Sequence, residues 1–439
     1  MGKNLTRSTL ALAVVGAMSS FAMANETVTT GAEKDTTQLQ TIVVSATGYE
    51  QDVSKAPASI TVISREELDK REYNDITDVL RSVPGVVITG ENASQTVSIR
   101  GMSSNYTLFL VDGKRQYSKD VNPNGDDYGM EKNILPPVAS IERIEIIRGP
   151  ASTLYGSDAM GGVINIITKR PKAVPQFTAD IFSTSWLESN IDIGYRTSLG
   201  SKADALIGVN YFNYNHPIDN NNDNFTDMSL QNRVSVFSKW NFNRKSEKEF
   251  SLVSRYLYED RWGGEMQWNK SYRGGSEVYG ESIYTKRVEL LSKYQLPTTE
   301  NMYLSFSMTA HDQNSVYGNT IYLANQKIAF GQYTWDKKLE NHNLLLGAAF
   351  RYQYYDDNTT ATLSAEQTKI YSVFLQDEIK LAEKHHILLG ARYDYNNNHG
   401  NIFTPRIAYK WNPTENDVFR INAGTGFRIV NLFTEEHAA

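Results

Sequence analysis

Cationic and aromatic residues are interleaved at two places in the chain, and together they could bind a planar, negatively charged ligand. Aromatic faces stack on flat ligands and attract cations, while guanidinium and ammonium groups attract anions. Ordinary solvated loops can have the same composition, so two interpretations stand side by side. The candidate ligand-binding residues are Lys114, Arg115 and Tyr117 in the first group, and Arg261, Trp262, Trp268 and Arg273 in the second.

No local motif supplies the groups that an enzyme or a metal centre needs. The chain has no cysteine, which excludes disulfides, thiol catalysis and Cys-ligated metal sites. Asp219–Asn224 resembles the start of a calcium loop, but Asn224 stands where the sharp turn needs Gly, and Leu230 replaces the last acidic ligand. His385 and His386 point to opposite faces of a strand, so they cannot bind one ion together. We therefore expect no enzymatic activity and no resident metal or cofactor.

The charge balance and the N-terminus indicate an exported protein. The 44 Lys+Arg and 50 Asp+Glu residues leave a formal net charge of −6, which argues against nucleic acid as a partner. Lys3 and Arg7 precede the apolar run Leu10–Met18 and a small-residue cleavage pattern, so residues 1–24 are predicted to be a signal peptide. Residues 25–40 are polar with little to bury, and we expect them to form a disordered tail.

Residues 50–170 carry the mixed signals of a small α/β domain. Ser64 followed by Glu67 is a capping box, which predicts the start of a helix. Short apolar runs predict strands, and Pro171–Pro175 is expected to be a linker. The predicted strands are Ser59–Ile63, Val97–Arg100, Leu108–Gly113, Ile141–Arg148 and Val163–Thr168.

From Phe177 onward apolar and polar residues alternate, which is the period of a β-strand. Met302–Ala310 and Leu344–Tyr354 are clear examples. The alternating runs extend over about ten residues or more, as in tilted membrane strands, whereas soluble strands average about 5–6. No apolar run reaches the ~18–20 residues of a spanning helix. The pattern therefore favours an antiparallel transmembrane β-barrel over a soluble sandwich.

The predicted connections alternate between short and long, as in outer-membrane barrels with short periplasmic turns and long outer loops. The short connections are 200–202, 243–247, 297–301, 340–341, 382–384 and 412–416, and the long ones are 214–228, 261–281, 315–325 and 357–367. About thirteen strands fit between Phe177 and Arg428, although bacterial barrels normally have an even number. We therefore expect the chain to be the N-terminal fragment of a longer barrel.

Several segments resemble the TonB-dependent outer-membrane receptors. These segments are Thr41–Ala46, Ser98–Gly101, Leu110–Gly113, Ile141–Pro150 and Leu154–Lys169. The resemblance is greatest to receptors for catecholate siderophores and colicins, and it implies a plug domain that fills a barrel of about 22 strands. The fold class is then mainly β, with a small mixed α/β plug before an incomplete barrel. The implied domains are a signal peptide (1–24), a tail with a TonB box (25–49), a plug (50–170) and a partial transmembrane barrel (171–439).

The same resemblance identifies a segment that binds the periplasmic protein TonB. This TonB box comprises Thr41, Ile42, Val43, Val44, Ser45 and Ala46. The segment is uncharged and rich in β-branched residues, so it can add as a strand to the exposed sheet edge of a partner. In the alternative interpretation it forms the first strand of the plug itself.

Charged residues alternate with isoleucines along the predicted strand 141–148, which offers a polar face to a polar barrel wall. We expect Arg100 and Arg148 to form charge-assisted bonds with barrel carboxylates, as a lock that can be released. An ordinary solvated strand face is the alternative. The predicted plug–barrel contact residues are Arg100, Glu142, Arg143 and Arg148.

The resemblance implies active uptake of a ferric siderophore, of catecholate type, across the outer membrane of a Gram-negative bacterium. The loop after Lys114 would be a plug apex that faces outwards, and the iron would arrive within the ligand. Outer-membrane lipid and a colicin or phage are further implied partners. The alternatives are a haem or cobalamin receptor of the same family, and a passive porin or outer-membrane hydrolase barrel, both of which would lack a plug.

Overall fold

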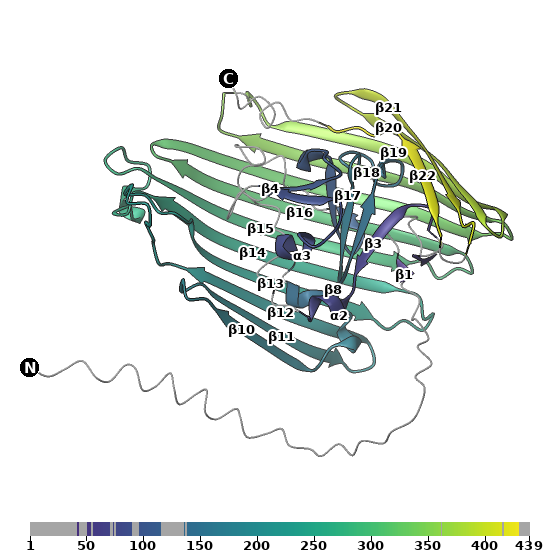
Figure 1. Ribbon diagram of the computed structural model, residues 1–439, viewed down its shortest axis with the longest axis horizontal. Coiled ribbons are helices and arrows are strands. Elements are labelled where there is room, and N and C mark those ends of the chain that lie inside the picture. The colour runs from purple at the N-terminus through teal and green to yellow at the C-terminus, as the bar shows by residue number, and fades with distance from the viewer. Residues whose placement is uncertain are drawn as a thin grey trace, which may run out of the picture. The chain divides into compact units, whose positions relative to one another are not determined.

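Two large sheets account for most of the structure. The computed structural model describes residues 42–43, 51–53, 56–70, 73, 76–89, 96–115, 136, 138–360, 362–414 and 417–429. Thr41–Ala439 forms one compact unit. Its described residues contain a 5-stranded sheet near the N-terminus and a 13-stranded sheet in the remainder (Figure 1). None of the described helices is long and apolar enough to cross a membrane.

The smaller sheet belongs to the N-terminal block, which we call the plug and which here means the described residues between 51 and 168. Its strand order is β3-β8-β9-β6-β7, and within it the pair β6–β9 is parallel. Two further pairs, β1–β2 and β4–β5, are antiparallel. The strands are β1 (Ile42–Val43), β2 (Gln51–Asp52), β3 (Ser59–Ile63), β4 (Val86–Thr89), β5 (Thr96–Ile99), β6 (Thr107–Val111), β7 (Lys114–Arg115), β8 (Ile141–Arg148) and β9 (Gly162–Thr168).

Short helices connect these strands. Helix α2 (Arg65–Leu68) has the predicted capping box: the amide of Ser64 donates to Glu67 Oε2 at 2.9 Å, and the amide of Glu67 donates to Ser64 Oγ at 3.3 Å. This reciprocal bonding satisfies donors that a helix start otherwise leaves free. The other described helices of the plug are α3 (Ile76–Leu80) and α5 (Ser152–Tyr155), with single 3₁₀ turns at η2 (Ser104–Tyr106) and η5 (Val138–Ser140). Two further 3₁₀ turns lie outside the plug: η6 (Pro171–Ala173) precedes β10, and η7 (Lys270–Tyr272) lies between β14 and β15.

The larger sheet confirms the prediction of about thirteen antiparallel strands. Each strand pairs with the next along the chain, from β10 to β22. The strands are β10 (Phe177–Ser183), β11 (Ser189–Leu199), β12 (Ala203–Tyr214), β13 (Leu230–Phe242), β14 (Phe250–Gly264), β15 (Gly280–Gln295), β16 (Asn301–Tyr317), β17 (Thr320–Lys338), β18 (His342–Asp357), β19 (Glu366–Ala382), β20 (His385–Asn396), β21 (Gly400–Trp411) and β22 (Phe419–Gly424).

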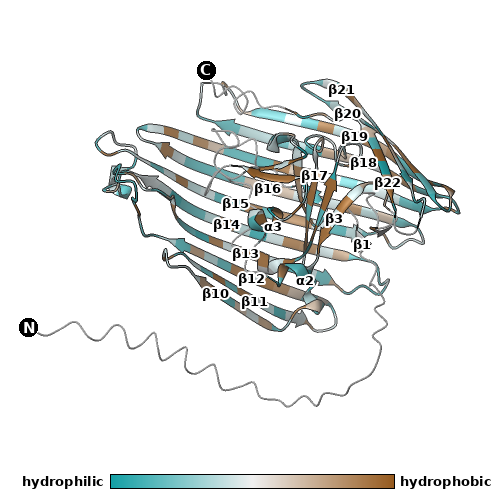
Figure 2. Ribbon diagram, viewed as in Figure 1, coloured by the Kyte–Doolittle hydropathy of each residue, from teal (hydrophilic) through white to brown (hydrophobic). Residues whose placement is uncertain are grey.

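One side of the large sheet carries apolar residues and the other carries polar ones. In β16 the side chains of Phe306 and Met308 are 51% and 58% exposed, whereas Ser307 and Thr309 are buried. Hydrophobic and hydrophilic positions accordingly alternate along the strands (Figure 2). Successive residues of a strand point to opposite faces, so the register of each strand fixes which residues lie on the apolar side and which on the polar side. We call the side with the buried polar residues the plug-facing side, because it makes the plug contacts described below.

The connections differ from the predicted short–long pattern at the loop end, where two of them have three residues or fewer. Strands β20 and β21 are joined by residues 397–399 alone. Strands β16 and β17 are joined by Gly318 and Asn319 alone, so the long loop expected over 315–325 is wrong. Gly318 has a φ of +59°, a conformation that a tight turn needs and that glycine adopts readily. Below, the turn end of the sheet is the end with connections 200–202, 243–249, 296–300, 339–341, 383–384 and 412–418. The loop end has connections 184–188, 215–229, 265–279, 318–319, 358–365 and 397–399.

Candidate functional site

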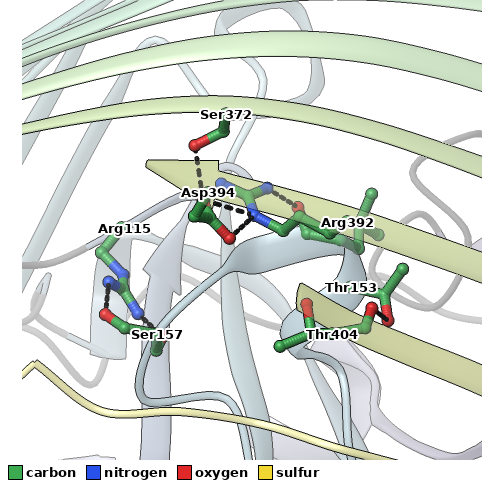
Figure 3. A network of polar contacts seen from close by, with 8 residues as sticks. Arg115, Thr153, Ser157, Ser372, Arg392, Asp394 and Thr404 are labelled. Atoms are coloured by element: carbon green, nitrogen blue, oxygen red, sulfur yellow. Dashed lines mark hydrogen bonds and ion pairs between the residues drawn. The ribbon is translucent and has the colours of Figure 1, made fainter. Parts of the chain in front are cut away.

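Helix α5 of the plug binds directly to the large sheet. Thr153 Oγ1 donates to the carbonyl oxygen of Thr404 on β21 at 3.2 Å. On the neighbouring strand β20, Arg392 Nη1 donates to the carbonyl oxygen of Leu154 at 3.3 Å. The last carbonyls of a helix have no partner within it, so Arg392 satisfies a group that would otherwise be buried without a bond. Figure 3 shows both contacts.

Buried neighbours on the sheet hold Arg392 in place. Its Nε lies 2.9 Å from both carboxylate oxygens of Asp394, and Ser372 Oγ donates to Asp394 Oδ1 at 2.6 Å (Figure 3). All three side chains are buried. A buried charge is tolerated when it is paired and fully hydrogen-bonded, and such bonds are strong. The sheet therefore presents a fixed cation to the end of α5.

Arg115, a predicted ligand-binding residue, joins strand β7 to the loop that follows α5. Its Nη1 donates to Ser157 Oγ at 2.9 Å (Figure 3). Its Nη2 lies 3.1 Å from Asp158 Oδ2. The amide of Asp158 in turn donates to the carbonyl oxygen of Phe427 at 2.9 Å. Arg115 is buried, and these bonds connect the plug to the segment after β22. Its role in ligand binding stays a prediction.

The other two plug residues predicted to bind ligand have different positions. Lys114 is buried, and burial lowers its pKa to about 8 although the carboxylate of Asp112 opposes this shift. Charges of Lys293 and Glu249, which lie at the turn end of the sheet, also act on Lys114. Tyr117 lies outside the described residues.

Three of the four predicted plug–barrel contact residues form hydrogen bonds with other residues of the plug. Arg148 Nη2 donates to Thr61 Oγ1 at 2.6 Å, and burial together with the nearby Arg100 guanidinium lowers the pKa of Arg148. Arg143 Nε donates to Glu145 Oε1 at 2.8 Å. The amide of Arg100 donates to the carbonyl oxygen of Gly85 at 2.8 Å. Glu142 lies on β8 and is half-buried. Their part in a releasable lock stays a prediction.

Apolar packing also joins the plug to the sheet. Five isoleucines of β8 and β9 share one buried cluster with side chains from four neighbouring strands of the sheet: Ile141, Ile144, Ile146, Ile164 and Ile166. The sheet residues in this cluster are Leu206, Phe237, Val253, Leu257 and Leu291. The expected contact between two purely polar surfaces is therefore incomplete, because apolar burial contributes at this interface as well.

A cluster of cations and aromatic rings lies at the loop end of β14 and β15. Lys270 Nζ is 5.3 Å from the ring centre of Trp262, and the Arg273 guanidinium is 4.7 Å from that of Tyr284. Lys270 also bonds to Asp260, and this hydrogen bond raises the pKa of Lys270. Cations held over aromatic faces are attracted by the negative charge of the ring face.

This cluster lies on the side of the sheet opposite the plug-facing side. Arg261 and Ile283 are buried on the plug-facing side, so their neighbours Trp262 and Tyr284 point the other way. Arg261 is 3.7 Å from Glu259. The expected loop position of Arg261 and Trp262 is corrected, because β14 continues to Gly264.

The sequence alone did not identify the partners of these residues. Arg273 donates to Ser282 Oγ at 3.1 Å and to Asn314 Oδ1 at 2.7 Å. Trp268 is buried against the backbone of Gly280. Period-two alternation places Ser282 and Tyr284 on one face of β15, which is the one signal that could have linked them beforehand.

The predicted TonB box is described only in part. Ile42 and Val43 form β1, with Ile42 paired to Asp52 and Val43 paired to Gln51 of β2. Thr41, Val44, Ser45 and Ala46 lie outside the described residues. This pairing favours neither interpretation of the segment, because a strand that pairs within the plug can also exchange partners.

Family models match both parts of the chain. Residues 52–163 match the TonB-dependent Receptor Plug Domain, and residues 190–434 match the TonB dependent receptor-like β-barrel. An iron-regulated outer membrane virulence protein of Vibrio cholerae is 35% identical over 408 residues, which cover 90% of this chain and 60% of the relative. The vitamin B12 transporter BtuB of Vibrio vulnificus is 27% identical, over 88% of this chain and 63% of the relative. The chain thus spans about 60% of the length of the first of these relatives.

Solved structures show the same fold. A mutant of the ferric enterobactin receptor PfeA of Pseudomonas aeruginosa has a TM-score of 0.70 at 19% identity, over 87% of this chain and 63% of that one. The siderophore receptor PirA of Acinetobacter baumannii has a TM-score of 0.64 at 20% identity, over 83% and 60%. With a plug docked on the polar side of an antiparallel sheet and with both family models matched, the chain belongs to the TonB-dependent receptor family.

Proposed function

We propose that the protein is a TonB-dependent transporter for the active uptake of a ferric siderophore of catecholate type. The observation that carries the proposal is the plug bonded through Arg392 and Thr153 to the polar side of the sheet. A passive porin and a hydrolase barrel have no need of such a domain. Members of this family are transporters rather than enzymes, so the ligand passes through chemically unchanged.

The proposed ligand class is supported by similarity and by the kinds of residue present. The Vibrio cholerae relative is named for iron regulation, and PfeA of Pseudomonas aeruginosa is a ferric enterobactin receptor. In this chain, Lys270 and Arg273 lie over aromatic rings at the loop end, on the side of the sheet opposite the plug-facing side, so this cluster would contact a ligand before the ligand reaches the plug. Cations and flat rings suit an anionic, aromatic ligand. The more distant similarity to BtuB keeps cobalamin as a second candidate, with haem as a third.

Ligand selectivity is tested by growth under iron limitation. Cells that lack their own receptors and produce this protein should grow on a purified ferric catecholate, and should gain nothing from haem as iron source or from cobalamin in a cobalamin-requiring strain. Lys270→Ala with Arg273→Ala should reduce uptake if this cluster binds ligand, whereas Lys245→Ala in the turn after β13 is the matched control. Growth on haem or cobalamin, with no growth on the ferric catecholate, would contradict the proposed substrate and assign the other ligand instead.

The proposed energy source is TonB, bound through residues 41–46. Main-chain hydrogen bonds supply the affinity in strand addition, and a proline removes one donor. Val43→Pro should therefore abolish uptake while ligand binding to cells persists. Thr30→Pro in the predicted tail is the control and should leave uptake unchanged. If Val43→Pro cells take up ligand at the normal rate, another segment contacts TonB.

The proposed organisation keeps the predicted boundaries: signal peptide 1–24, tail 25–49, plug 50–170 and partial barrel 171–439. The proposed partners are TonB, the siderophore and outer-membrane lipid. A colicin or phage as a further ligand belongs to the same proposal, and resistance of cells that lack the protein would test it.

A further inference from the structure

Lys239 on β13 reaches from the large sheet into the plug. Its Nζ donates to Asp112 Oδ2 at 3.1 Å, to Thr168 Oγ1 at 2.8 Å and to the carbonyl oxygen of Thr168 at 3.1 Å. An ammonium group has three donors, and here all three are directed at plug acceptors. The Lys239 side chain is 10% exposed and that of Asp112 is 12% exposed. The contact is therefore largely shielded from solvent.

The plug residues that receive Lys239 are themselves bonded to each other. Asp112 Oδ1 accepts from the amide of Thr168 at 2.9 Å, and Asp112 Oδ2 accepts from Thr168 Oγ1 at 2.7 Å. Asp112 follows β6, and Thr168 is the last residue of β9. Strands β6 and β9 are the parallel pair of the plug sheet. These hydrogen bonds therefore connect the ends of two central plug strands to β13.

The local electrostatics keep Asp112 charged. Burial raises the pKa of Asp112, but the ammonium groups of Lys239 and Lys114 and the bonds from Thr168 hold the pKa below its usual value. The backbone also favours this arrangement. Asp112 has a φ of +48° and Gly113 a φ of +76°, a tight turn that places the carboxylate beside Thr168.

Three other bonds between the described residues of the plug and the sheet are of a different kind. Arg392 donates to the carbonyl oxygen of Leu154, Thr153 donates to that of Thr404, and Arg420 donates to that of Ala56 at 3.1 Å. These bonds have a main-chain acceptor, which no substitution removes. Lys239 and Asp112 instead form an ion pair between two side chains, so either partner can be changed.

We propose that Lys239 is a positioning residue that clamps the ends of β6 and β9 to β13 and so keeps the plug seated when no ligand is being transported. The part of this proposal that concerns transport rests on the proposed function. The part that concerns the attachment of the plug to the sheet rests only on the contacts of Lys239. The clamp lies at the turn end of the sheet, where the chain leaves β9 and enters β10.

The first experiment measures seating without any siderophore. In Lys239→Met, which keeps most of the side-chain volume, we expect amide hydrogen exchange at the ends of β6 and β9 to become roughly tenfold faster or more, because one partner of a buried pair has gone. Conductance in planar bilayers and sensitivity of cells to large antibiotics should rise as well. Lys245→Met, at an exposed lysine in the next turn, is the control.

A double-mutant cycle distinguishes a specific clamp from general loosening. Asp112→Asn should also speed exchange, and Lys239→Met with Asp112→Asn should be no worse than the more severe single variant. Heat-modifiable migration on gels identifies variants whose strands still fold. A folded Lys239→Met protein with normal exchange and conductance would overturn the proposal, as would purely additive effects. Failure of siderophore uptake by the unaltered protein would overturn the proposed function and leave the clamp standing.

Discussion

In the plug, Ile146 and Ile164 are fully buried, whereas in the large sheet Phe306 and Met308 are more than half exposed. Charged residues show the reverse: Arg392 and Asp394 of the sheet are buried, while α2 of the plug carries exposed charges. The plug is thus built like a soluble protein, and the sheet is built with its polar side toward the plug. In the plug, apolar side chains are buried in a core, whereas in the sheet they lie on the side that faces lipid.

The largest effect is expected where the sheet buries charge. Asp394→Ala leaves Arg392 buried without its carboxylate, which should lower the free energy of unfolding by about 3–5 kcal/mol. Denaturant unfolding of the purified protein measures the loss. Asp223→Ala, at an exposed loop aspartate, should cost little. Equal losses in both variants would contradict the claim that burial of the Arg392–Asp394 pair makes its loss costly.

A slightly smaller effect is expected in the plug core. Ile164→Ala leaves a cavity beside Ile146 and should destabilise the plug by about 2–5 kcal/mol. Hydrogen exchange across β8 and β9 reports this change directly. Met308→Ala removes a side chain of similar size from the exposed face of β16, so it should leave exchange in the plug unaltered. A plug that responds to Met308→Ala would contradict the separation of the two regions.

Charge on the exposed side of the sheet should also be costly. Met308 lies near the middle of β16, and Met308→Arg should destabilise the protein in lipid by about 2–4 kcal/mol. Folding into lipid vesicles with a urea titration measures this cost. Asn319→Arg, in the adjoining turn, lies at the end of the strand and should be tolerated. Equal tolerance of both variants would show that this face does not contact lipid.

The buried Lys114 makes plug stability depend on pH. Its pKa falls from an ordinary value of 10.5 to about 8 on folding, so between these values the unfolded chain binds the proton and the folded one does not. The free energy of unfolding should therefore rise as the pH increases from about 8 to 10.5. Below pH 8 the destabilisation caused by burying the charged Lys114 should be at its maximum. Exchange rates in the plug, compared between the unaltered protein and Lys114→Met, isolate this contribution. A constant difference between the two across this window would refute it.

The smallest effect is expected for the partly exposed ion pair at the loop end. Lys270→Gln breaks its bond to Asp260, and surface pairs contribute about 0–1 kcal/mol. Thermal or denaturant midpoints should shift barely at all, while any change in ligand binding would then be attributable to the lost charge. A large loss of stability would indicate that the loop 265–279 supports the sheet.

Local patterns were sufficient for much of the fold. The capping box at Ser64, the strand Ile141–Arg148 and about thirteen alternating strands were all predicted and are confirmed, as are the family and the outer membrane of a Gram-negative bacterium as its location. Each of these depends on neighbours within a few residues, or on a motif that is continuous in the chain. The tight turn at Gly318 was missed, because alternation continues on both sides and hides where one strand ends.

The sequence by itself determined the class of the protein, the period of its strands and the residues able to carry charge. Only the tertiary structure decided which charges meet. Lys239 lies 127 residues from Asp112 in the chain, and Arg392 lies 238 residues from Leu154. Strand register and the docking of the plug bring these pairs together, and no local spacing encodes them. The contact of Arg100 and Arg148 with the barrel wall stays a prediction, because a charged side chain carries no information about which distant partner it will face.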